Sequence, residues 1–185
     1  MTIALYLFLA IFSTPEEMVF DFGKGKSGEN WAVVNDGVMG GLSNGKAVLT
    51  DDSMVFSGTV SLENNGGFTS LRAPYARYDL SVYDQVEIKY KSSGLDCALN
   101  VYQYQRFWRP NFKMPIASSN DEWKTISINI NELKEYRMGR VTGRTMSEGA
   151  AKNTIRLGFI TDSKKEGSFK LEVAYIKFST ISEKS

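Results

Sequence analysis

The sequence contains no histidine and only one cysteine, Cys97, among its 185 residues. Without histidine there is no imidazole general base, no Ser-His-Asp or Cys-His catalytic pair, and no zinc site of the usual His and Cys type. A lone cysteine forms no disulfide within the chain, so Cys97, in an apparent strand, is interpreted as a small buried apolar residue. Carboxylate-only mechanisms, such as those of glycosidases, and calcium binding through oxygen ligands are compatible with this composition.

Neither sign of charge dominates, because the sequence contains 22 lysines and arginines and 21 aspartates and glutamates. No net field therefore favours nucleic acid or an anionic membrane surface, and we expect no nucleic-acid partner. The length and the 42% of apolar residues suit one ordinary folded domain. We place this domain at residues 19–179 and read residues 180–185 as a polar tail.

The amino terminus carries an uninterrupted apolar run, Ile3 to Phe12 (IALYLFLAIF). The run is too short to span a bilayer, which takes about 20 residues. It resembles the apolar region of a secretory signal peptide, although the positively charged leader is absent. We interpret residues 1–15 as an export signal or membrane tether, with a buried strand or a misassigned start as alternatives. An exported, periplasmic or membrane-associated protein is therefore expected, and a cytoplasmic one is the alternative.

Short runs of alternating apolar and polar residues follow, which is typical of half-buried strands. Val86, Ile88 and Tyr90 alternate with polar residues, and the same pattern recurs at 126–130, 155–159 and 169–173. Turn residues separate the runs, and the only helical candidate, Asn131 to Tyr136, is about one and a half turns long. The pattern predicts an all-β domain of two packed antiparallel sheets.

A glycine-rich stretch, NDGVMGGLSNGK at residues 35–46, precedes one of these predicted strands. The glycines do not have the GxGxxG spacing of a phosphate-binding loop, and the chain continues as a strand rather than a helix. We therefore predict hairpin-type turns with positive φ at Asp36-Gly37 and Asn44-Gly45, and close approach of two segments at Gly40-Gly41. The loop-forming residues are predicted to be Asn35, Asp36, Gly37, Gly40 and Gly41.

Two blocks, WAVVNDGVMGGLSNG from Trp31 and FSGTVSLENNGGFTSLR from Phe56 to Arg72, resemble the complex I intermediate-associated protein 30 family. The resemblance continues through QRFWRPNF (105–112), Trp123, 155–159 and 169–178. It implies a galactose-binding-like jelly roll, the fold of carbohydrate-binding modules. It also implies a non-catalytic role in assembling NADH:ubiquinone oxidoreductase. An exported member suggests a bacterial setting, in which the client need not be complex I.

Aromatic and basic residues concentrate just after residue 101, where Tyr102, Tyr104, Arg106 and Trp108 follow one another. Aromatic planes stack on sugars or peptides and guanidinium groups bind polar groups, so we predict a binding surface here, with Arg72 nearby. Alternation would put Tyr102 and Tyr104 on one face of a strand, with the other residues beyond its end. The alternative is that the aromatics only pack and the arginines are only solvated.

Two further polar groups are weaker candidates for a site. Asn64 and Asn65, in the sequence NNGG, are read either as a polar ligand clamp or as a tight hairpin. No cofactor is expected, and the alternative is a structural calcium ion held by Asp21, Asp36 and Glu172.

The sequence thus predicts a non-catalytic binding domain that acts as a protein-complex assembly or chaperone-like factor. Its expected partners are proteins, including membrane-bound respiratory subunits. The alternative is a carbohydrate-binding module that binds glycans on an aromatic and arginine-bearing concave face. A hydrolase based on carboxylates alone is the third hypothesis.

Overall fold

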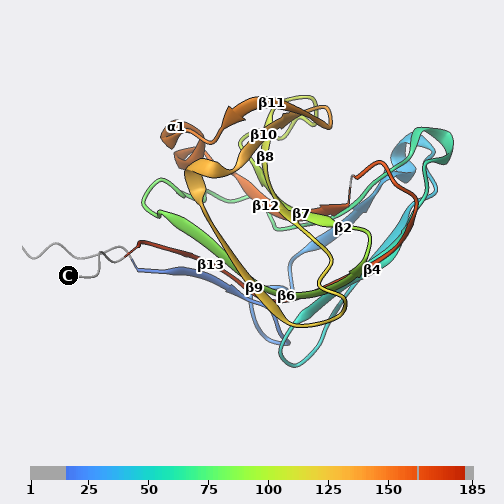
Figure 1. Cartoon of the computed structure of the whole chain (residues 1–185), viewed down its shortest axis with the longest axis horizontal. Coiled ribbons are helices and arrows are strands. Elements are labelled where there is room, and N and C mark those ends of the chain that lie inside the picture. The colour runs from blue at the N-terminus through green and yellow to red at the C-terminus, as the bar shows by residue number, and fades with distance from the viewer. Residues whose placement is uncertain (1–15, 162, 182–185) are drawn as a thin grey trace, which may run out of the picture.

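The computed structural model describes residues 16–161 and 163–181, which form two antiparallel sheets packed face to face (Figure 1). The predicted export signal at 1–15 and most of the polar tail lie outside the described residues, so both stay predictions. Sheet A has the strand order β3 (Asn44–Leu49), β4 (Met54–Val60), β13 (Gly167–Ser179), β6 (Gln85–Gly94) and β9 (Lys124–Asn129), and β1 (Met18–Asp21) also pairs with β13.

Sheet B lies over sheet A and contains strands from distant parts of the chain. Its order is β11 (Arg140–Thr145), β10 (Lys134–Arg137), β8 (Asn111–Ile116), β7 (Cys97–Tyr102), β12 (Arg156–Thr161), β5 (Thr69–Arg72) and β2 (Ala32–Asn35). Connections include the 3-10 turns η1 (Asp36–Met39), η2 (Glu63–Asn65) and η3 (Ile130–Glu132), and the short helix α1 (Glu148–Lys152). Among the described residues, no helix is long and apolar enough to cross a bilayer.

The core between the sheets is built from the apolar members of the alternating runs. Val86, Ile88 and Tyr90 of β6 are buried, as are Leu157 and Phe159 of β12. An aromatic cluster joins the layers, because Phe22 lies edge-on to Trp31 with ring centroids 5.0 Å apart and Trp31 stacks on Phe159 at 5.8 Å. Cys97 is buried in the same core. The predicted all-β fold of two antiparallel sheets is thus confirmed.

The helix was predicted in the wrong segment, at Asn131 to Tyr136. Residues 131–136 do not form an α-helix: Asn131 and Glu132 belong to the 3-10 turn η3, Leu133 is fully buried, and Lys134–Arg137 pairs with β8 as strand β10. The α-helix occurs instead at Glu148–Lys152, where the Ser147 hydroxyl caps it by accepting a hydrogen bond from Ala150 N. Pairing with a neighbouring strand outweighed the local helix propensity, which is a weak determinant on its own.

The glycine-rich stretch is folded differently from the prediction of two hairpin turns. Asp36-Gly37 begins the 3-10 turn η1, Gly45 lies inside β3, and Asn35 ends β2 rather than forming a loop. The positive φ occurs at Gly40, where it is 86°. The predicted close approach is at Gly41, where a side chain would collide with the carboxylate of Asp36.

That carboxylate joins two connections that cross between the sheets. Asp36 is 1% exposed, and it accepts hydrogen bonds from Ser43 N at 3.1 Å, Gly67 N at 2.7 Å and Phe68 N at 3.2 Å. The second connection runs from β4 in sheet A to β5 in sheet B, so Asn64-Asn65-Gly66-Gly67 is a crossover and not the predicted hairpin. Charge-assisted hydrogen bonds to buried backbone are among the stronger polar contacts in a fold.

Candidate binding face of sheet B

The strand register of sheet B places a set of polar and aromatic side chains on the face that points away from the core, called the outer face below. Residues paired directly across an antiparallel ladder lie on the same face. One row of paired positions runs Arg72, Gly158, Asn100, Lys113 and Lys134. The next row runs Arg156, Tyr102, Asn111 and Tyr136. The alternate positions, such as Leu71, Leu99 and Phe159, fill the core.

Several of these outward side chains are buried although they point away from the core. Asn100 is 1% exposed and Lys113 is 5% exposed. Within the part of the chain that the structure describes, the buried atoms Asn100 Oδ1, Asn111 Oδ1 and Arg156 Nε have no hydrogen-bond partner. Native proteins leave few buried polar atoms unsatisfied, and such atoms commonly mark places where water, an ion or a ligand binds.

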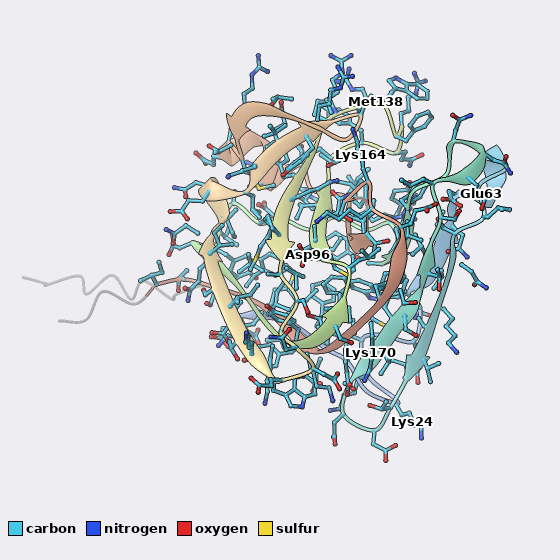
Figure 2. The ribbon with its side chains drawn as sticks, turned by 45° about the vertical axis from the view of Figure 1, so that its right-hand side comes forward. Lys24, Glu63, Asp96, Met138, Lys164 and Lys170 are labelled. Carbon is cyan, nitrogen blue, oxygen red and sulfur yellow. The ribbon has the colours of Figure 1, made fainter. Side chains whose placement is uncertain are left out.

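Sheet B curls away from sheet A at one edge. Its β8, β10 and β11 strands rise away from sheet A (Figure 1). The turn between β10 and β11 approaches the connection that follows β12, since a Cβ atom on Gly139 would lie 3.9 Å from Lys164 Cε. Figure 2 shows Met138 of this turn and Lys164 at the same end of the molecule. The β10–β11 turn at this edge of sheet B therefore lies near a connection that is distant from it in the chain.

Cations and aromatic rings are paired along this face. The Arg72 guanidinium carbon lies 5.8 Å from the centroid of Tyr102, and Lys113 Nζ lies 4.8 Å from that of Tyr136. Arg156 stacks on Tyr75, with its guanidinium carbon 3.4 Å from the ring centroid. Such pairs are stabilising when partly desolvated, and they hold both members in defined orientations.

The two arginines are further constrained by their surroundings. Ser70 Oγ accepts a hydrogen bond of 2.9 Å from Arg72 Nε and donates one of 3.2 Å to Val34 O, which fixes Arg72 along the face. Burial lowers the pKa of the Arg156 guanidinium, and the positive charge of Arg72 lowers it further. Arg156 therefore carries its charge in an environment that disfavours it.

The sequence prediction named Tyr102 and Arg72 of this face and placed Tyr104 wrongly on the same strand. Tyr102 and Arg72 do lie together on the outer face. Tyr104 is not on the strand, because β7 ends at Tyr102. Tyr104 lies in the exposed β7–β8 loop together with Arg106 and Trp108, which were expected beyond the end of the strand. In this loop Arg109 stacks on Tyr104 at 4.2 Å and Arg106 on Trp108 at 5.4 Å.

The asparagines of the predicted polar clamp are not part of this face. Asn64 and Asn65 are exposed in η2 and have positive φ values of 54° and 60°. They precede Thr69, which begins β5, whereas Arg72 ends that strand. The structure therefore does not bring them beside Tyr102. Their conformation suits asparagine, which tolerates the left-handed region better than most residues.

The three carboxylates of the calcium alternative are separated and engaged elsewhere. Asp36 holds the two connections described above, Asp21 pairs with Lys26 at 3.1 Å, and Glu172 pairs with Lys91 at 3.1 Å. In residues 16–161 and 163–181, no three acidic, histidine or cysteine side chains are grouped so as to hold a metal ion.

Six residues of the outer face were not predicted as site residues from the sequence: Tyr75, Asn100, Asn111, Lys113, Tyr136 and Arg156. A signal existed for some of them. In the alternating runs of β7 and β12, the residues between the core positions include Asn100 and Arg156. The alternation marks them as outward-facing, but it does not show that β7 and β12 are neighbours.

The curled sandwich with its polar and aromatic outer face defines a galactose-binding-like jelly roll, the class of fold found in carbohydrate-binding modules. Within that class, the family model of complex I intermediate-associated protein 30 matches residues 20–173, so the chain belongs to this family, as its sequence motifs predicted. No curated protein sequence matches the chain.

Solved structures with this fold include carbohydrate-binding modules. The family 11 module of a cellulosomal cellulase from Clostridium thermocellum is 19% identical, with a TM-score of 0.67 over 93% of this chain and 99% of that chain. The family 11 module from the same organism in complex with a β-1,3-1,4-mixed-linked tetrasaccharide gives a TM-score of 0.64 at 19% identity, over 91% and 98% of the two chains. A family 29 module variant gives 0.54 at 12% identity, over 90% and 93%. At these identities the likeness shows the fold.

Proposed function

We propose that this chain is a non-catalytic binding domain that holds an oligosaccharide on the outer face of sheet B. The observation that carries the proposal is that three buried polar atoms of this face have no partners: Asn100 Oδ1, Asn111 Oδ1 and Arg156 Nε. A buried polar atom left unsatisfied costs about 1–3 kcal/mol. A ligand that supplies hydrogen-bond partners to all three would recover this free energy on binding.

The chemistry of the face fits a sugar. Sugar hydroxyls both donate and accept hydrogen bonds, so they suit the two amide oxygens and the guanidinium N–H together. The rings of Tyr102 and Tyr136 lie in the same row of paired positions, with Asn111 between them. Aromatic rings beside polar groups present an apolar surface together with hydrogen-bonding partners, as a saccharide requires.

We also propose that the outer face binds its ligand without catalysing a reaction. Glycosidases use two carboxyl groups about 5–10 Å apart on either side of the scissile bond. In the two rows of paired positions described above, none of the outward-facing residues is an aspartate or glutamate. Binding without hydrolysis is the function that these positions support.

The family membership favours a second candidate, an assembly factor that binds protein. The β7–β8 loop presents Tyr104, Phe107 and Trp108, whose exposed fractions are 44%, 67% and 44%. Tryptophan, tyrosine and arginine are enriched among the residues that contribute most of the binding energy at protein interfaces. In this role the loop, rather than the outer face, would make the main contact with a subunit of NADH:ubiquinone oxidoreductase or of another complex.

Substitution of Tyr102 tests the saccharide proposal. Titration calorimetry with neutral and acidic oligosaccharides is expected to give saturable binding that Tyr102→Ala weakens at least about fivefold, since stacking on a ring contributes about 1 kcal/mol or more. Tyr175→Ala is the matched control, because Tyr175 lies on the outward side of sheet A and bonds to Glu87 at 2.8 Å. Equal losses in the two variants, with both folded by circular dichroism, would contradict the proposal.

Affinity purification from membranes tests the assembly candidate. Recovery of respiratory subunits with the wild-type chain, lost in Trp108→Ala but retained in Tyr102→Ala, would favour the loop as the functional surface. The opposite pattern would favour the outer face. The two variants lie close in the chain but on different surfaces, so they separate the two candidates.

A further inference from the structure

We propose that Arg72 and Arg156 form a subsite for a carboxylate, so that the saccharide bound on the outer face contains an acidic sugar. This inference rests on the proposed function and specifies its ligand. It concerns the end of the face where β5, β12 and β7 are adjacent.

The sheet register brings the two arginines together. Arg72 pairs with Gly158, which is two positions along β12 from Arg156, so both side chains point to the outer face. Gly158, opposite Arg72, has no side chain; a Cβ atom there would lie 2.7 Å from Leu71 O and 3.5 Å from Arg72 Cγ. A larger residue at this position would therefore press against the strand that carries Arg72.

Neither arginine forms an ion pair with a carboxylate of the described residues. Sheet A shows a different arrangement on its outward side. There Lys91 pairs with Glu172 at 3.1 Å and Lys177 with Glu87 at 3.5 Å. The chain thus pairs basic groups with acids on one sheet and leaves two adjacent arginines without such partners on the other.

The two guanidinium groups are also arranged to receive an anion. Arg72 is held at Nε by Ser70, and Arg156 is stacked on Tyr75 with its own Nε buried and without a partner. Two like charges close together repel each other, and the lowered pKa of Arg156 reflects both burial and this repulsion. A bound carboxylate would relieve the repulsion and would accept charge-assisted hydrogen bonds from both groups.

The neighbouring residues indicate that the anion belongs to a sugar and is not a lone ion. Asn100 pairs with Gly158 across the ladder, and Asn111 pairs with Tyr102, so their partnerless amide oxygens lie in the same two rows as the arginines. These oxygens need hydrogen-bond donors, which a carboxylate lacks and which sugar hydroxyls supply. A uronic acid carries both kinds of group on one ring.

The test compares acidic oligosaccharides with their uncharged methyl esters. A panel of oligogalacturonate, oligomannuronate and glucuronate-containing oligosaccharides, each with its fully methyl-esterified counterpart, is titrated against the full chain, beside neutral glucans and a sulfated galactan. At least one acid is expected to bind at least tenfold more tightly than its ester. Arg72→Gln and Arg156→Gln are each expected to remove that preference, because each deletes a charged hydrogen-bond donor.

Lys46→Gln is the control for overall charge, because Lys46 is exposed on β3 of sheet A. It should leave the preference for the acid unchanged, and urea unfolding should show that all three variants are folded. An ester that binds as tightly as its acid, with binding still lost in Tyr102→Ala, would overturn the carboxylate subsite and leave the proposed function standing. Binding of the sulfated galactan but of no uronate would also overturn it. No saturable binding of any saccharide, neutral or acidic, would overturn the proposed function as well.

Discussion

Asp36→Ala is expected to lower the free energy of unfolding by about 3 kcal/mol, because it leaves one buried and two partly buried backbone N–H groups without an acceptor. These groups belong to Ser43, Gly67 and Phe68. They lie on two connections, so the loss would loosen both crossovers between the sheets. The neighbouring glycines leave little room for rearrangement, since a Cβ on Gly66 would lie 2.7 Å from Asp36 Oδ2.

Urea unfolding of the wild type and the variant measures this effect. The control is Asp52→Ala, because Asp52 is exposed in the turn between β3 and β4. Such a surface change is expected to alter stability by no more than about 0.5 kcal/mol. Similar midpoints for Asp36→Ala and Asp52→Ala would show that the buried carboxylate does not hold the connections.

The contribution of Asp36 to the free energy of unfolding should also depend on pH. Burial of the carboxylate opposes ionisation, but the hydrogen bonds from Ser43, Gly67 and Phe68 outweigh it and hold the pKa below its usual value of 3.8. A carboxyl with a lower pKa in the folded state stabilises the fold at neutral pH, and it loses this effect as the pH falls below the unfolded value and through the folded one. The stability difference between wild type and Asp36→Asn should therefore be constant from pH 7 to about 5 and shrink below about pH 4. A difference that grew on acidification would contradict this sign.

Phe159→Ala is expected to have a still larger effect, about 4 kcal/mol, because it opens a cavity at the centre of the core. Phe159 is fully buried, stacks on Trp31 at 5.8 Å and lies 6.4 Å from Phe22, centroid to centroid. It is on β12, the strand that carries Arg156 and Gly158 on its other face. Loss of the ring would therefore also disturb the strand that supports the candidate subsite.

Two comparisons make this prediction specific. Phe159→Leu keeps most of the apolar volume and is expected to cost about 1 kcal/mol. Phe107→Ala removes the same ring from a position that is 67% exposed, and should change stability by no more than about 0.5 kcal/mol. Differential scanning calorimetry of the three variants measures the order of their stability losses. An effect of Phe159→Ala no larger than that of Phe107→Ala would contradict the role assigned to the aromatic cluster.

Local sequence predicted the strands well where one face is buried, and it was less successful elsewhere. The alternating runs at 86–90 and 169–173 are strands because burial of every second side chain imposes that period. The segment 131–136 has no such pattern, and its pairing with β8 decided its conformation. Asp-Gly is a common hairpin dipeptide, but Asp36-Gly37 begins a 3-10 turn. The buried carboxylate of Asp36 accepts hydrogen bonds from the backbone of two connections.

The candidate site, like the fold, was predicted only in part from the sequence. Tyr102 and Arg72 were predicted from residue type and lie together, whereas Tyr104 was assigned to a strand that ends before it. Arg156 and Asn100 lie in correctly predicted strands but were not recognised. Nothing local distinguishes an arginine that lies alone on a solvated strand from one that lies beside another arginine.

The sequence by itself determined that this chain forms a two-sheet antiparallel domain, belongs to the complex I intermediate-associated protein 30 family and has no histidine chemistry. These properties follow from residue type, short-range alternation and motif. Only the tertiary structure decided which outward residues share a surface. Hydrogen bonding between strands joins β5, β12 and β7, which are distant in the chain, so Arg72, Arg156 and Asn100 become neighbours through pairing that no local pattern specifies.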